Sequence, residues 1–173
     1  MNIFIGGSIG ISNLNAVIRD RLDDFRKRGN TILIGDANGA DKAVQTYLAR
    51  HDYRNVTVFC MEECRNNVGT WPVRHVLPPS GRERNVMAHE AGCGMMLWDA
   101  KSNGTLQNVL NLVGAGKRTL VYFAPSKDFH VVANEKDLRS LLARCQSRDL
   151  ETIVRGLGLK TPRPQPHARQ LFD

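Results

Sequence analysis

Residues Gly81–Gln107, GRERNVMAHEAGCGMMLWDAKSNGTLQ, carry the clearest structural signal in the sequence. They predict a short helix bearing two arginines, then a strand over Cys93–Trp98, then a polar loop that opens another helix. The strand is almost continuously apolar, which is typical of a strand covered on both faces. At the N-terminus of the following helix, unpaired N–H groups and the positive end of the helix dipole favour an anion. This stretch therefore predicts a phosphate site at the end of a buried strand.

Outward from this stretch, short apolar runs alternate with helical patterns. The expected strands are Asn2–Ile5, Thr31–Ile34, Val56–Phe59, Cys93–Trp98 and Thr119–Phe123. The alternation predicts an α/β, Rossmann-like fold with a predominantly parallel five-stranded sheet and helices on both faces. Residues 1–130 are expected to form this nucleotide-binding domain, and residues 131–173 a C-terminal helical segment with a Pro-rich tail. The leucine pattern around Leu138–Leu142 indicates the first helix of that segment.

Three loops at the carboxyl ends of the expected strands are rich in glycine and small polar residues. Because such ends share one edge of a parallel sheet, where ligands bind, we expect the loops to form one pocket. With the arginine that precedes the strand, the expected ligand-binding residues are Gly6, Gly7, Ser8, Gly35, Asp36, Asn38, Gly39, Asp41, Arg82, Ser102, Asn103, Gly104 and Thr105.

The acidic residues in these loops have two interpretations. Asp36 and Asp41 either cap the following helix, or Asp41 holds a ribose hydroxyl or a neighbouring loop. Asp99, at a strand end, either fixes its loop or acts on a sugar C1′, and loop fixing is the commoner role.

The remaining local signals concern helix starts and one long loop. Ser12 and Asn13 are expected to cap a helix over residues 14–28, and Ser80 the helix that carries the arginines. Residues 61–79 lack any period and predict a long loop. Within it, Trp71 either stacks on a base or anchors the loop to the core.

Composition narrows the class of partner. The formal charge is +7 and the pI about 9.6, which favours anionic ligands, but the basic residues form no run of five or more. We therefore favour a nucleotide or nucleoside phosphate over nucleic acid as the partner, and we expect no membrane partner. The N-terminus passes directly into the Gly6-Gly7 turn without a secretory signal, so a soluble, cytoplasmic protein is expected.

The four cysteines are expected to be free thiols, as in most intracellular proteins. Cys60 and Cys64 have a spacing that could supply half a zinc site, but no second ligand pair follows. We therefore expect no metal and no cofactor.

Three motifs together resemble the SLOG superfamily, which includes DprA, the Lonely Guy phosphoribohydrolases and the YspA-like proteins. They are Gly6-Gly7-Ser8, the loop Gly35–Asp41, and Ser102-Asn103-Gly104-Thr105. The second and third motifs are similar to the G-G-A-x-G-A-D and K-S-x-G-T motifs of the YspA-like branch. The resemblance covers about residues 2–124 and implies a nucleotide site. It also implies a homodimer or higher homo-oligomer, because relatives commonly pair through helices beside the site.

The Lonely Guy enzymes remove a base from a nucleoside 5′-monophosphate, using an R-K-x-x-M arginine and a G-G-x-G-T-x-x-E phosphate loop. Arg84-Asn85-Val86-Met87 is similar to the first motif, and Asn103-Gly104-Thr105 to the second. The resemblance thus implies that Arg84, rather than Arg82, reaches the phosphate. The acidic position is filled by Gln107 or Asn108, which puts hydrolysis in doubt. Nucleoside 2-deoxyribosyltransferases and deoxynucleotide N-hydrolases share a similar fold and use a carboxylate at the sugar C1′. The candidates for it are Asp36, Asp41, Glu83, Glu90 and Asp99, of which Asp99 is placed best, at a strand end beside the phosphate loop.

These observations rank three functions. The first is binding of a nucleotide or nucleotide derivative at the strand ends. The second is cleavage or transfer at the N-glycosidic bond of a nucleoside 5′-monophosphate, with Arg84 and Asp99 as the catalytic residues. The third is a DprA-like nucleic-acid binder, which only the charge and the fold relation favour.

Overall fold

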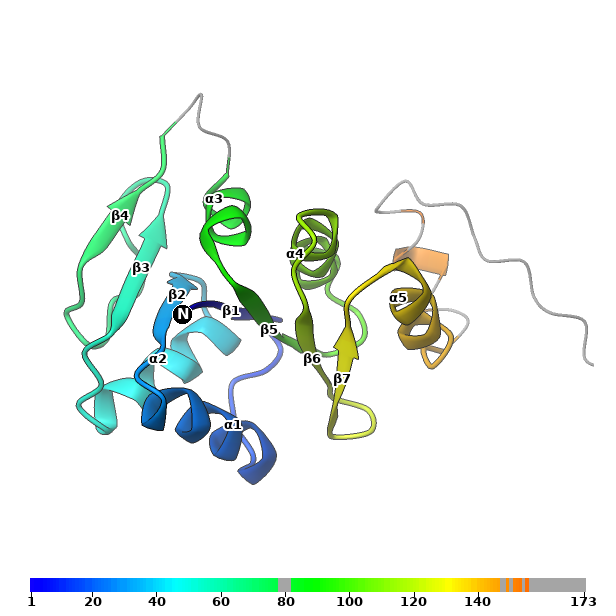
Figure 1. Cartoon of the computed structure of the whole chain (residues 1–173), viewed down its shortest axis with the longest axis horizontal. Helices are drawn as coiled ribbons and strands as arrows, with labels where there is room; N and C mark the ends of the chain where they lie inside the picture. The colour runs from blue at the N-terminus through cyan, green and yellow to red at the C-terminus, as the bar shows by residue number, and fades with distance from the viewer. Residues whose placement is uncertain (78–81, 147–148, 150, 154, 156–173) are drawn as a thin grey trace, which may run out of the picture.

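One seven-stranded sheet organises the molecule, in the order β4-β3-β2-β1-β5-β6-β7 (Figure 1). The structure is a computed structural model and describes residues 1–77, 82–146, 149, 151–153 and 155. The strands are β1 (Asn2–Gly7), β2 (Thr31–Gly35), β3 (Val56–Cys60), β4 (Val73–His75), β5 (Cys93–Trp98), β6 (Thr119–Phe123) and β7 (Asp128–Val132).

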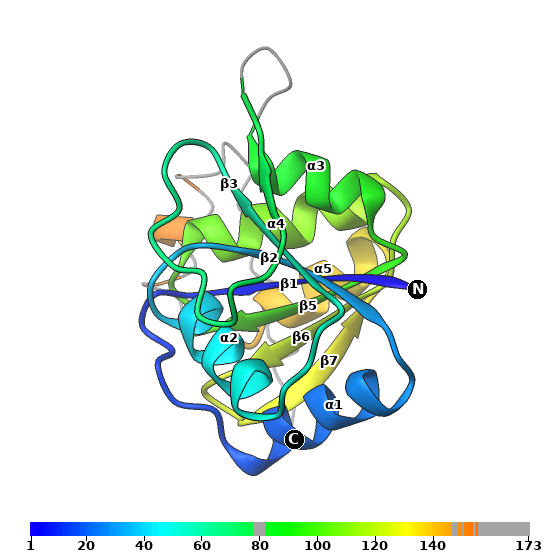
Figure 2. The same cartoon turned by 90° about the vertical axis from the view of Figure 1, so that its left-hand side faces the viewer.

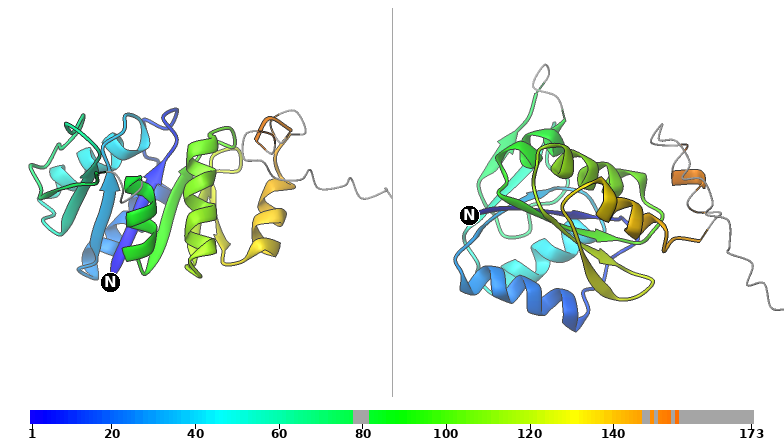
Figure 3. Two further views of the ribbon diagram at one scale, coloured as in Figure 1. Left: turned by 90° about the horizontal axis from the view of Figure 1, so that it is seen from above. Right: turned by 45° about the vertical axis from the view of Figure 1, so that its right-hand side comes forward.

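Helices cover both faces of the sheet. They are α1 (Ala16–Lys27), α2 (Ala40–Arg50), α3 (Glu83–Glu90), α4 (Asn103–Gly114) and α5 (Glu135–Leu142). Figure 2 shows α1 and α2 on one side of the strands and α3 and α4 on the other, and Figure 3 shows α5 beside α4. Two apolar cores result, one on each face: Ile18, Leu22 and Val44 contribute to the first, and Met87, Val109 and Leu138 to the second.

The strands pair as the alternating pattern predicts, except at the two edges of the sheet. Every pair from β4 to β6 is parallel, and β7 is antiparallel to β6. The α/β sheet with helices on both faces is therefore confirmed, and the number of five strands is wrong. β4 has only three residues, all exposed, and β7 has a single buried residue, so neither has the apolar run that reveals a buried strand.

The chain reverses its direction of travel across the sheet beside β1. It moves from β1 to β2, β3 and β4, then returns to place β5 against the other side of β1, with Gly7 opposite Leu97. At such a switch point the two following loops diverge and leave a crevice at the carboxyl ends. The loops expected to form one pocket follow β1, β2 and β5, the strands around this point.

Several expected helix starts differ from the structure. Asn15, rather than Ser12 or Asn13, caps α1, because its side-chain oxygen accepts a hydrogen bond from the Ile18 N–H at 3.0 Å. Arg82 is the N-cap of α3 and makes no side-chain capping bond, while Ser80 lies outside the described residues.

The C-terminal segment is described in part. α5 packs Leu138, Leu141 and Leu142 into the core, whereas the Pro-rich tail from residue 156 lies outside the described residues. The division at residue 130 stays a prediction. Among the described residues, no helix is long and apolar enough to span a membrane.

Candidate functional site

Ser8 lies at the centre of the switch point and joins three elements. Its side chain is fully buried; the hydroxyl accepts a hydrogen bond from the Asp99 N–H at 3.1 Å and lies 3.1 Å from the Thr105 hydroxyl. Its carbonyl accepts a hydrogen bond from the N–H of Ala40, the first residue of α2. Ser8 therefore ties β1 to the loop after β5 and to the starts of α2 and α4.

The N-terminus of α4 leaves backbone donors free beside this hydroxyl cluster. Ser102 is the N-cap, and its hydroxyl oxygen accepts hydrogen bonds from the N–H and the hydroxyl of Thr105. The N–H groups of Asn103 and Gly104 have no partner among the described residues, as is usual for the first turn of a helix. They are the donors that an anion would meet.

Arg84 places a cation next to these free donors. Its Nη1 lies 3.8 Å from the position that a Cβ atom would take at Gly104. The side chain is half-buried, its Nε is buried without a hydrogen-bond partner, and no carboxylate pairs with it among the described residues. Arg82 is exposed at the start of α3. We call Ser8, Arg84 and the segment Asp99–Thr105 the strand-end site.

Asn108 also reaches this site, although the motif comparison only marked it as a missing acid. Its Nδ2 lies 3.4 Å from the position of a Cβ at Gly6, and its Oδ1 is buried without a partner in the described part of the chain. Gln107 instead bonds to Asn111 on the same helix. Position 108 is thus the one that faces the strand ends.

Asp99 is engaged with its own loop. One carboxylate oxygen, Oδ1, accepts hydrogen bonds from the N–H groups of Lys101 at 2.9 Å and Ser102 at 2.8 Å. The other, Oδ2, faces Gly10, 3.2 Å from where a Cβ would stand. The geometry gives Asp99 the loop-fixing role, and its proposed action on a sugar stays a prediction. Between these residues Ala100 has a φ of 67°, an unfavourable value for alanine that recurs at functional sites.

The loop after β2 directs its polar side chains to neighbouring segments of the chain. Asp41 is buried and accepts a hydrogen bond from the Ala37 N–H, and its Oδ2 lies 2.7 Å from the Cβ position of Gly35. Burial raises the pKa of Asp41 to about 7. Of the two roles expected for Asp41, the structure thus favours holding a loop.

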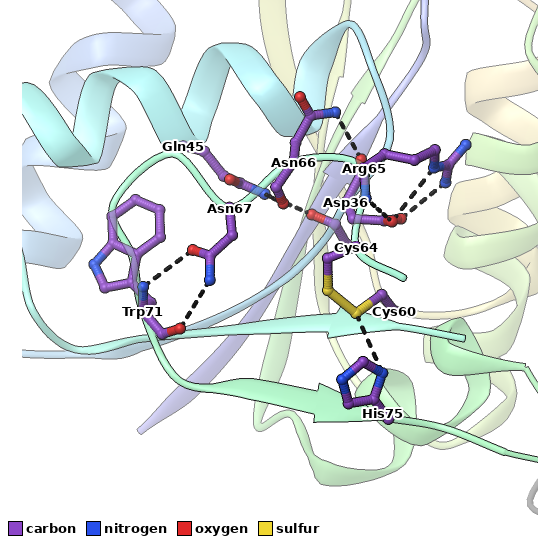
Figure 4. The surroundings of a disulfide bond; sticks show 10 residues. Asp36, Gln45, Cys60, Cys64, Arg65, Asn66, Asn67, Trp71 and His75 are labelled. Atoms are coloured by element: carbon purple, nitrogen blue, oxygen red, sulfur yellow. Dashed lines mark hydrogen bonds and ion pairs between the residues drawn. A yellow bond between two sulfur atoms is a disulfide. The ribbon is translucent and has the colours of Figure 1, made fainter. Parts of the chain in front are cut away.

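Asp36 and Asn38 anchor the long loop that follows β3, and Figure 4 shows the contacts of Asp36. The Asp36 carboxylate pairs with the Arg65 guanidinium at 2.8 Å and accepts a hydrogen bond from the Arg65 N–H. Asn66 donates to the Asp36 carbonyl and to the Asn38 side chain. Burial acts to raise the pKa of Asp36, but the hydrogen bonds from Arg65 outweigh it and hold that pKa below its ordinary value. These residues join the loop after β2 to the loop after β3.

A disulfide closes the start of the same loop. Cys60, the last residue of β3, is bonded to Cys64, with the Cα atoms 5.5 Å apart, and the His75 imidazole lies 3.9 Å from the Cys60 sulfur (Figure 4). The expectation of four free thiols is wrong for this pair, because the turn after β3 brings the two residues within bonding reach. Cys93 and Cys145 are free.

Trp71 anchors the far end of the loop. It is 5% exposed, and its indole N–H donates to the Tyr53 carbonyl at 2.8 Å. Of its two expected roles, the structure therefore favours anchoring over base stacking.

Comparison with known proteins gives a likeness of fold. No family model matches the sequence, and no curated protein matches it. The structure is similar to that of DNA processing protein A from Helicobacter pylori, at a TM-score of 0.50 and 10% sequence identity, over 90% of this chain and 81% of that one. The description of that structure concerns how the protein binds single-stranded DNA.

This likeness bears on two expectations. The expectation that disfavoured nucleic acid as a partner is contradicted, because a protein of this fold binds single-stranded DNA. The absence of a linear basic run was a poor guide, since a fold gathers cations from separate elements. The chain therefore has the α/β fold of DNA processing protein A, as the resemblance to the SLOG superfamily implies.

Proposed function

We propose that this protein binds the phosphate group of a nucleotide unit at the strand-end site, either in a free nucleotide or within a single-stranded nucleic acid. The observation that carries the proposal is Arg84, a half-buried cation without a carboxylate partner in the described chain, beside the free N–H groups of Asn103 and Gly104. A phosphate between them would accept charge-assisted hydrogen bonds from the guanidinium and from the helix N-terminus.

The roles of the site residues follow from their hydrogen bonds. Ser8, Ser102 and Thr105 bond to one another or to nearby backbone, so they shape the site. Gly104 leaves the helix N-terminus open, because it has no side chain to fill the space next to Arg84. Asn108 would meet the sugar or the base, since its buried oxygen lacks a partner in the described chain. The motifs Gly35–Asp41 and Lys101–Thr105 favour the YspA-like branch for this protein.

Ligand-dependent thermal stabilisation tests this function. The wild-type protein is titrated with nucleoside 5′-monophosphates, the matching nucleosides and a short single-stranded oligonucleotide. A ligand present at about 100 times its Kd should stabilise the protein by about 2.7 kcal/mol. Stabilisation by monophosphates identifies the free nucleotide as sufficient, and stabilisation by the oligonucleotide alone assigns the phosphate to a nucleic-acid chain. Equal stabilisation by nucleosides and their phosphates would contradict the proposal.

Cleavage of the N-glycosidic bond is a second candidate. It is favoured by Glu83, which precedes Arg84 and has one buried carboxylate oxygen without a partner in the described part of the chain. A carboxylate there could act as a general acid or base at the sugar. Release of free base from a nucleoside monophosphate, measured by chromatography and lost in Glu83→Gln, would support it. No release across ribo- and deoxynucleotides would rule it out.

A further inference from the structure

A basic groove runs along α2 on the face of the sheet that carries α1. It has a volume of about 690 Å³ and lies between the segment that joins β1 to α1 and the outer side of α2. Figure 2 shows that segment beside the start of α2. A hollow of this size is within the range of ligand-binding sites.

The side chains that line the groove favour an anion. Arg19, Lys42, Arg50 and His51 are all exposed there, and no acidic side chain is among the lining residues. None of the four forms an ion pair with another described residue. The groove therefore keeps its positive charge available to a ligand.

One acid that contacts the groove lining is already engaged. Asp23 on α1 accepts a hydrogen bond from the Tyr47 hydroxyl at 2.9 Å and pairs with Arg26 at 2.6 Å. The Arg19 guanidinium donates one hydrogen bond, to the Leu14 carbonyl, and its other N–H groups have no partner in the described part of the chain.

The groove begins where the strand-end site ends. Gly39, the N-cap of α2, lines the groove, and its backbone packs so closely on Ile9 that a Cβ would stand 2.2 Å from the Ile9 carbonyl oxygen. The Ala40 N–H donates to the carbonyl of Ser8. From Gly39 the basic side of α2 extends about 16 Å along its 11 residues. At about 3.4 Å per nucleotide of a stacked strand, this length spans roughly five phosphates.

The groove also offers aromatic surface. The rings of Tyr47 and His51, one helical turn apart on α2, lie 4.6 Å from centroid to centroid. Cations that follow a phosphate backbone, with aromatic rings on which bases stack, are the combination that binds single strands without sequence preference.

We propose that the groove along α2 holds the sugar-phosphate chain of a single-stranded nucleic acid whose first nucleotide occupies the strand-end site. This inference rests on the proposed function and names its ligand. Lys42 and Arg50 contact phosphates, and Tyr47 with His51 provides a stacking surface.

The test compares two double variants that remove equal charge. Lys42→Ala/Arg50→Ala alters the groove, and Lys117→Ala/Arg118→Ala, immediately before β6 at the amino-terminal edge of the sheet, is the matched control. Binding of a fluorescent thymidine oligonucleotide of about twelve nucleotides, a length typical of single-strand sites, is measured across a salt series. Unfolding curves verify that both variants are folded.

We expect the groove variant to bind the oligonucleotide at least about tenfold more weakly than wild type. Its slope of log K against log salt should be smaller by about 1.4, which is 0.7 for each of two lost phosphate contacts. The affinity for thymidine monophosphate should be the same in the groove variant and in wild type. The control variant should match wild type in every measurement.

Each part of the proposal has its own contrary result. An unchanged affinity and salt slope in the groove variant, or no oligonucleotide binding by wild type, would overturn the groove as a nucleic-acid site. Equal competition by polyglutamate would assign the groove to acidic proteins and would also overturn it. If the groove variant weakens oligonucleotide binding but Arg84→Ala leaves it unchanged, the groove stands and the strand-end site fails.

Discussion

Arg84 lies beside the positive end of the α4 dipole without a carboxylate to balance it, and a cation in that position is unfavourable for the unliganded protein. Buried polar atoms without partners are rare in folded proteins. Six described side chains have such an atom; Arg26, Glu83 and Thr119 are three of them, and the other three, Arg84, Asn103 and Asn108, lie around the start of α4. At the scale of single residues, this concentration distinguishes a binding site from ordinary surface.

Replacing Arg84 should separate binding from stability. Arg84→Ala is expected to weaken nucleotide binding at least about tenfold, because the charge-assisted hydrogen bonds are lost. The free energy of unfolding without ligand should stay the same or rise by up to about 1 kcal/mol, because a cation leaves a helix N-terminus. Isothermal titration and urea unfolding measure the two quantities.

Arg82→Ala is the matched control, since Arg82 is exposed two residues earlier in the chain. It should retain wild-type affinity. Full binding by Arg84→Ala, or equal losses in the two variants, would contradict the role assigned to Arg84.

Asp41 makes the stability of the fold depend on pH. Its pKa rises from 3.8 to about 7 in the folded protein, so the folded state keeps a proton that the unfolded state releases between these values. The free energy of unfolding should therefore fall as pH rises from about 4 to about 7, and then level off. At about 1.4 kcal/mol per pKa unit, this contribution is at most about 4 kcal/mol.

Asp41→Asn cannot ionise and should lack this fall. The pKa of Asp36 is lowered and acts in the opposite direction, so its stabilisation is lost as pH falls, but it is common to both proteins and cancels in the difference. Urea unfolding at a series of pH values gives the two curves. Parallel curves would show that Asp41 does not carry the dependence.

At the scale of elements, the loops that surround the crevice depend on one another. The loop after β3 holds the loop after β2 through Arg65 and Asn66, and its own start is fixed by the bond between Cys60 and Cys64. Gln45 of α2 donates to the carbonyls of Gly35 and Asn66, which joins both loops to the helix. The loop after β2, the loop after β3 and α2 are therefore held together by side-chain contacts.

Reduction of the disulfide should destabilise the loop after β3. By chain-entropy theory, a disulfide that closes so short a loop stabilises the fold by about 2 kcal/mol. The free energy of unfolding of Cys64→Ser, or of wild type in reducing agent, should therefore be lower by that amount in urea unfolding. Cys93→Ser is the control, because Cys93 is a free cysteine. Detection of free Cys60 and Cys64 thiols by mass spectrometry of the native protein would exclude the bond.

Two glycines allow a comparison of backbone strain with lack of space. Gly39 and Gly29 both have positive φ, 78° and 65°, but an added Cβ meets the Ile9 backbone at Gly39 and open space at Gly29. Gly29→Ala should cost about 1 kcal/mol of stability from strain alone. Gly39→Ala should cost more, because the backbone at Ile9 must also move. Equal losses in thermal unfolding would mean that the contact with Ile9 is unimportant.

At the scale of the whole molecule, the sequence was sufficient for the parallel core of the sheet and insufficient for its edges. Buried strands such as Cys93–Trp98 have an uninterrupted apolar run, and their order with the helices implies the switch point. β4 and β7 have no such run, because edge strands need not be apolar.

The candidate site could be predicted only in part from the sequence, for a related reason. Glycine and hydroxyl motifs indicate where loops lie, and they led to Ser8 and the start of α4, whereas the similarity to the R-K-x-x-M motif led to Arg84. They do not indicate which polar groups bond to one another. Only the folded contacts reveal that Asp36 pairs with Arg65 and that the cations of the groove gather from α1 and α2. Linear sequence also separates Asn108 from Gly6, which face each other in space.

The most direct test of the strand-end site is an NMR titration that follows the backbone amides of Asn103 and Gly104. A nucleoside 5′-monophosphate is added to the labelled protein, with the corresponding nucleoside as control. Because phosphate would accept hydrogen bonds from these two free N–H groups, we predict large shifts of their resonances with the monophosphate, none with the nucleoside, and none in Arg84→Ala. Binding of the monophosphate that leaves both resonances unmoved in wild type would contradict a phosphate site at the start of α4.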